Sequence, residues 1–217
     1  MNYHARASDN NSPSLPSGPF GRLGAQRIPW TVPSQGPTRN SWLHVEAVGT
    51  TVIRNRLLRV GRDMSYERIE RELHIEATPE IVFSVISRPE HMKLWWPDEA
   101  EFARAPGATG EISFNGDEAG QIHVFGLTLV EVDPPWRFSF RWCYPEGHTA
   151  NPENSLLVTF DLTQEGTGTR VRMTEIGFRD QGRTEAEIAE QYEAHEEGWA
   201  RHLPRLAPCV DALASRS

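Results

Sequence analysis

The sequence predicts an α+β domain in which a curved antiparallel sheet is covered on one face by a long C-terminal helix. Residues 184–213 place apolar side chains every three or four positions, which is the spacing of one helix face. Several earlier segments alternate apolar and polar residues, as half-buried strands do. Since a sheet with one apolar face needs a cover, a single helix across that face satisfies both patterns.

The first strand and two short helices are expected in residues 66–94. Residues 66–77 alternate, with Ile69, Leu73 and Ile75 on one face. The run Thr78-Pro79-Glu80 is typical of a helix start, because threonine caps, proline fits the first turn and glutamate lies near the positive helix end. Pro89 ends this helix and begins a second one through Leu94.

The remaining strands are expected between the short helices and the closing helix. Gly126 is a candidate for a β-bulge. Trp136 begins a sharply alternating run that continues with Phe138 and Phe140. The expected strands cover residues 111–114, 120–132, 136–142, 156–162 and 169–177.

The closing helix begins with a capping box formed by Thr184 and Glu187. His195 fills the one gap in its apolar series. Pro204 and Pro208 fall inside the helix, and an interior proline removes a hydrogen bond and kinks the backbone. We therefore expect a bend near residues 201–204. The apolar series consists of Ile188, Tyr192, Trp199, Leu203, Leu206, Val210 and Leu213.

Residues 1–63 differ in character from residues 64–217. Residues 1–40 are rich in Ser, Pro, Gly and Asn without apolar periodicity, so we expect a low-complexity, disordered extension before the folded domain. The first segment carries eight arginines and three acidic residues, giving +5, whereas the second carries 14 basic and 27 acidic residues, giving −13. One hypothesis is that translation naturally starts at Met64.

Composition argues against several classes of protein. The acidic body disfavours binding to nucleic-acid phosphates. No apolar run approaches the roughly 18 residues of a membrane span, and no signal-peptide core opens the chain. Cys143 and Cys209 lie far apart without metal-site spacing. We expect a cytoplasmic protein with reduced thiols, no nucleic-acid or membrane partner, and no metal or cofactor.

Four stretches carry a resemblance to a known superfamily. The chain resembles the START/Bet v-like (SRPBCC, helix-grip) superfamily, in the branch similar to the C-terminal domain of the activator of heat-shock-protein-90 ATPase. The resemblance covers about residues 66–214. It implies an antiparallel sheet of seven or fewer strands around the C-terminal helix, with a hydrophobic pocket between them, and it does not specify an activity. The four stretches are residues 77–83 with 89–96, 131–142, 168–178, and 195–199 with Leu203 and Leu206.

The pocket that this resemblance implies would be lined mostly by aromatic side chains, although each of these residues is also compatible with a plain core. No nucleophile elbow, P-loop or dinucleotide-binding glycine motif is present. The candidate pocket residues are Trp95, Trp96, Phe125, Phe140, Trp142, Phe160, Glu175, His195 and Trp199.

Glu175 and His195 are the two candidates for acid/base chemistry. Glu175 lies on the inward face of its strand by alternation, so it either acts on a ligand or forms a structural pair, with Arg71 as the expected partner. His195 is either a polar handle in the pocket or a core histidine. His195-Glu196 is no zinc-protease motif, because the fourth residue after His195 is Trp199. His195 and His202 share a helix face but have no evident third metal ligand.

Three functions follow as hypotheses. The first is a soluble binding protein, monomeric or dimeric, that holds a small hydrophobic or aromatic ligand without catalysis. The second is an enzyme of the cyclase or dehydratase sort that uses Glu175 and His195. The third, implied by the resemblance, is a partner of the heat-shock-protein-90 chaperone.

Overall fold

The computed structural model describes residues 66–116, 118 and 120–215, and the predicted extension over residues 1–63 lies outside them. The described residues form the expected α+β arrangement, a seven-stranded antiparallel sheet with a long C-terminal helix. The strands are β1 (Arg68–Ile75), β2 (Glu99–Phe102), β3 (Thr109–Asn115), β4 (Ile122–Asp133), β5 (Arg137–Trp142), β6 (Leu156–Glu165) and β7 (Gly168–Ile176). The helices are α1 (Pro79–Ser87), α2 (Pro89–Met92), α3 (Glu185–His202), the 3₁₀ helix η1 (Leu203–Arg205) and α4 (Leu206–Ala214).

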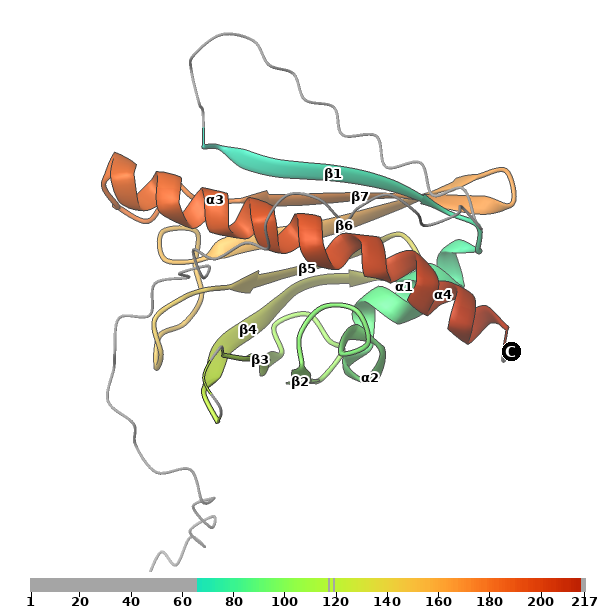
Figure 1. Ribbon diagram of the computed structural model, residues 1–217, viewed down its shortest axis with the longest axis horizontal. Helices are drawn as coiled ribbons and strands as arrows, with labels where there is room; N and C mark the ends of the chain where they lie inside the picture. Colours follow the sequence, from blue (N-terminus) through green and yellow to red (C-terminus); the bar gives the residue numbers. More distant parts are fainter. Residues whose placement is uncertain (1–65, 117, 119, 216–217) are drawn as a thin grey trace, which may run out of the picture. The chain divides into compact units, whose positions relative to one another are not determined.

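The sheet has the order β1-β7-β6-β5-β4-β3-β2. From β2 to β7 each strand pairs with its neighbour in sequence, and β1 closes the order by pairing with β7. Figure 1 shows α3 running across one face of this sheet, with α1 beside α4 at the far end. Within the described part of the chain, every helix is too short or too polar to cross a membrane.

The inward face of the central strands is apolar and fully buried, as the alternation predicted. Phe138 and Phe140 of β5 lie opposite Phe160 and Val158 of β6. Burial of such rings from water is the main favourable contribution to folding a domain of this kind. The core therefore lies between the concave sheet face and the helices.

Three sequence expectations differ from the structure. The short edge strand β2 was missed, because four residues carry too little alternation to stand out. The register shift of β4 lies between Leu129 and Glu131, not at Gly126. At Gly126 an added Cβ would lie 2.8 Å from Tyr144 Oη, so this glycine accommodates a neighbouring side chain. Trp136 is 45% exposed because it belongs to the turn before β5.

The closing helix begins and breaks at the predicted places. Thr184 Oγ1 accepts the Glu187 backbone N–H, and the Glu187 carboxylate accepts the Thr184 N–H at 3.0 Å, which is the capping box. Pro204 lies in η1, where the tighter 3₁₀ turn interrupts the α-helix. Pro208 falls in the first turn of α4, where its missing N–H leaves no hydrogen bond unmade.

Gly177 directly follows β7 and has a backbone conformation that other residues rarely adopt. Its φ is +106°, and an added Cβ would lie 2.8 Å from the Ser155 carbonyl oxygen. We expect Gly177→Ala to lower the free energy of unfolding by about 3 kcal/mol. Gly182→Ala is the matched control, because Gly182 has φ +65° but open space around it, and a loss of about 1 kcal/mol is expected there. Equal losses in urea denaturation would contradict the steric part of this prediction.

Candidate functional site

A buried carboxylate, Glu175, lies at the centre of the candidate site. Its side chain is on the inward face of β7 and is fully buried. Trp142 Nε1–H donates to Oε1 at 2.8 Å, and Trp199 Nε1–H donates to Oε2 at 2.7 Å. His195 Nδ1 lies 3.0 Å from Oε1 and 3.1 Å from Oε2. Hydrogen bonds to an ionised acceptor are short and strong, so these donors compensate the desolvation of the charge.

Two separate elements, β5 and α3, deliver these donors to the carboxylate on β7. Trp142 is the last residue of β5, while His195 and Trp199 lie four residues apart on α3 and therefore share one helix face. The carboxylate can only accept a hydrogen bond, so Nδ1 of His195 must be the donor. A neutral His195 therefore carries its proton on Nδ1 and its acceptor lone pair on Nε2. The sequence named all four residues as candidates, and the structure brings them into direct contact.

The expected pair between Glu175 and Arg71 was wrong. Arg71 donates instead to Glu196 of α3, with Nη2 and Oε1 3.0 Å apart. The two side chains of this ion pair are 21% and 45% exposed, so it lies at the edge of the core. Histidine and two indoles reach Glu175 from the interior, and their N–H groups occupy the carboxylate oxygens that an arginine would have needed.

The remaining predicted pocket residues belong to one aromatic cluster on the inward sheet face. Trp95 and Phe160 are fully buried and pack edge-to-face with centroids 6.0 Å apart. Trp95 Nε1–H also donates to the Val85 carbonyl at 3.3 Å. Trp96 lies at the centre of the cluster. Its ring contacts five other rings at centroid distances of 5.0–6.2 Å, those of Trp95, Phe114, Phe140, Trp142 and Trp199.

The aromatic cluster becomes half-buried toward the β3–β4 hairpin. Phe125 packs on Trp142 at 5.9 Å and on Phe114 at 6.0 Å. Phe114 in turn lies 6.3 Å from the ring of His202 on α3. The sequence included Phe125 among the pocket residues but missed Phe114 and His202. Two sequence signals could have identified these residues. Phe114 alternates with Ile112 along the strand, and His202 shares a helix face with His195.

Burial, and secondarily the nearby Arg205, lower the pKa of His202 from its usual 6.5. Because the folded-state pKa lies below the unfolded one, the unfolded chain takes up this proton first as the pH falls. The stability that neutral His202 contributes is therefore complete above about pH 6.5 and is lost as the pH falls through the folded-state pKa.

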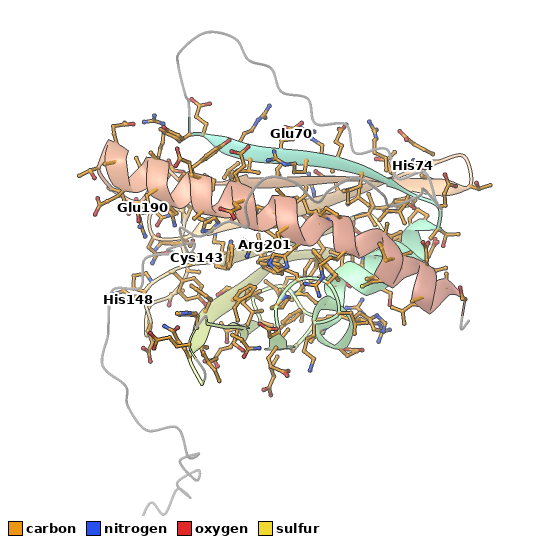
Figure 2. All side chains as sticks on the ribbon, viewed as in Figure 1. Glu70, His74, Cys143, His148, Glu190 and Arg201 are labelled. Atoms are coloured by element: carbon orange, nitrogen blue, oxygen red, sulfur yellow. The ribbon has the colours of Figure 1, made fainter. Side chains whose placement is uncertain are left out.

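We expect His202→Gln to reduce the loss of stability between pH 7.5 and pH 5, measured by urea denaturation at both pH values. His148→Gln, in the exposed loop after β5 (Figure 2), should retain the full loss. An unchanged pH dependence in His202→Gln would contradict this prediction.

Cys143 follows Trp142 directly and has a positive φ of 57°. Burial, followed by the charge of Glu175, raises the pKa of its thiol well above 9.0. A thiol held in its protonated form is a poor nucleophile, so Cys143 is not suited to nucleophilic chemistry. Among the described residues, no group of three or more His, Cys, Asp or Glu is placed to hold a metal ion.

Among known proteins, one family model matches this chain, and many solved structures resemble it. The family model described as "Activator of Hsp90 ATPase homolog 1-like protein" matches residues 76–211. No curated protein matches the chain significantly. The match spans α1 to α4 and includes every residue of the Glu175 site.

Several solved structures share the fold. A protein from Mesorhizobium loti superposes with a TM-score of 0.54 at 24% identity, covering 67% of this chain and 97% of that one. A protein from Nitrosomonas europaea gives 0.57 at 16% identity, with 70% and 98% covered. A protein from Arthrobacter aurescens gives 0.56 at 16% identity, with 71% and 92% covered. At these identities the likeness concerns the fold alone.

Proposed function

We propose that this chain, which belongs to the family of activator of Hsp90 ATPase homolog 1-like proteins, binds one small hydrophobic or aromatic ligand. The ligand would lie between the sheet and the C-terminal helix. Ligand sites are mostly apolar surfaces with a few converging polar groups. The observation that carries this proposal is the aromatic cluster, which runs from half-buried Phe114 and Phe125 to the fully buried Glu175.

The arrangement fits a ligand that is flat and apolar. Rings at centroid distances near 5–6 Å offer stacking and edge-to-face contacts to another ring. Trp142 and Trp199 direct their N–H groups to Glu175, so their faces provide apolar surface without an unmet donor. Binding there would bury apolar area on both partners.

Ligand titration followed by tryptophan emission tests this proposal. Naphthalene, 2-naphthol and dodecanol serve as neutral apolar probes, and at least one should bind saturably at a single site. Phe125→Ala should weaken that binding about tenfold, because it removes a contact ring. Trp136→Ala, at an exposed position, should leave it unchanged. Absence of saturable binding by all three probes would refute the proposal.

The pair of Glu175 and His195 supports a second candidate, acid/base catalysis on a bound ligand. With Nδ1 held by the carboxylate, Nε2 of His195 is the atom that would accept or return a proton. In any turnover assay that detects an activity, His195→Gln should lower kcat by about a hundredfold or more while Phe125→Ala mainly raises KM. An unaltered kcat in His195→Gln would remove this candidate.

The description of the family suggests a third candidate, stimulation of the ATPase of Hsp90. It is tested by adding the purified protein to Hsp90 and measuring ATP hydrolysis. A rate that does not change with the protein in excess would count against it.

A further inference from the structure

His123 places an unsatisfied ring nitrogen beside the half-buried end of the aromatic cluster. It lies on β4 directly opposite Phe114 of β3, and paired residues of an antiparallel ladder face the same side. Phe125 is two residues further along β4 and shares that face. Alternation with the buried Leu127 and Leu129 identifies this side as the inward one.

The Nδ1 atom of His123 is buried and has no hydrogen-bond partner within the part of the chain that the structure describes. Buried polar atoms in folded proteins nearly always have a partner, and the exceptions call for an explanation such as a ligand. Its neighbours on this face are the aromatic rings of Phe114 and Phe125. A ligand lying on these rings could present a polar group to His123.

A hydroxyl is the polar group that this nitrogen accommodates best. A neutral histidine has Nδ1 either as a donor or as an acceptor, and a hydroxyl can serve both states because it accepts and donates. A carbonyl would satisfy only the donor state.

The charges around this end of the cluster favour a neutral ligand. The carboxylate of Glu175 lies beyond Phe125 and Trp142 in the same cluster, and its charge opposes an anion. On the other side, Arg205 lies close enough to His202 to lower the pKa of that histidine, and its charge opposes a cation. Neither charge penalises a neutral compound.

We propose that His123 is the specificity-determining residue of this site and that the ligand class is a neutral aromatic compound bearing a hydroxyl group. This inference rests on the proposed ligand-binding function. The ring system packs on Phe114 and Phe125, and the hydroxyl forms a hydrogen bond with His123 Nδ1. Selectivity then arises because an analogue without the hydroxyl leaves the buried nitrogen unpaired.

The test compares 2-naphthol with naphthalene, which differ by the hydroxyl alone, and adds 2-naphthoate as an anionic probe. Dissociation constants are measured by calorimetry or tryptophan emission for the wild type, His123→Phe and the control His148→Phe. The wild type and the control should bind 2-naphthol about tenfold more tightly than naphthalene, the value of one hydrogen bond. His123→Phe should bind both equally, with its affinity for naphthalene preserved.

The outcomes separate this inference from the proposed function. If the wild type binds both neutral compounds equally, or His123→Phe retains the preference, His123 does not read the hydroxyl, although ligand binding stands. Tighter binding of 2-naphthoate than of 2-naphthol would overturn the neutral class. If neither neutral compound binds, the inference fails, and the proposed function fails as well when dodecanol also shows no saturable binding. His123→Leu repeats the comparison if His123→Phe loses naphthalene binding.

Discussion

Replacing Glu175 with alanine is expected to lower the free energy of unfolding by about 3–5 kcal/mol. The substitution leaves two indole N–H groups and His195 buried without their acceptor. It also leaves a cavity at a fully buried position, because the strand cannot move inward to fill it. Both effects act in the same direction, so this is among the most damaging single changes available in the domain.

Urea denaturation followed by far-UV circular dichroism measures this loss. Glu101→Ala is the matched control, since Glu101 is an exposed residue of the edge strand β2. A change within about 0.5 kcal/mol is expected there. An equally small change for Glu175→Ala would mean that the buried carboxylate does not stabilise the fold.

Replacing Trp96 with alanine is expected to cost about 3–5 kcal/mol as well. Trp96 is only 5% exposed and contacts five other aromatic rings, including the stacked ring of Trp199 at 5.0 Å. Its loss removes one contact point at which the segment after α2, strand β5 and helix α3 meet. Cores of rigid aromatic rings relax little around such a void, so most of the lost packing is not recovered.

Trp136→Ala provides the control for this second prediction. It deletes the same side chain at a position that is 45% exposed. A loss below about 1 kcal/mol is expected in urea denaturation. Similar losses at positions 96 and 136 would show that the aromatic cluster does not hold the core together.

The two roles of Glu175 bear on how the site is tested. If the carboxylate stabilises the fold as strongly as we expect, a loss of activity in its variants reports unfolding as readily as chemistry. His195→Gln and His123→Phe are better probes, because each alters one partner and leaves the aromatic cluster in place. If these variants still bind ligand, they are folded, so the binding measurement also controls for folding.

Much of the fold was predictable because its signals are local. The alternation in residues 66–77 predicted β1, and the capping box at Thr184 with Glu187 predicted the start of α3. Pro204 predicted the break that the structure shows as η1. The resemblance to the helix-grip superfamily is confirmed by the family match and by the structures that share the fold. The short strand β2 had too few residues for such a signal.

The sequence by itself determined which face each candidate residue occupies, since periods of 2 and 3.6 residues assign faces directly. It placed Glu175 inward on its strand and His195 on the apolar stripe of its helix. Only the tertiary structure decided their partners. Glu175 meets Trp142 across 33 residues and Trp199 across 24, while Arg71 turns to Glu196. Periodicity reports the direction of a side chain, but a partner depends on the curvature of the sheet and the path of the helix across it, which many distant contacts set together.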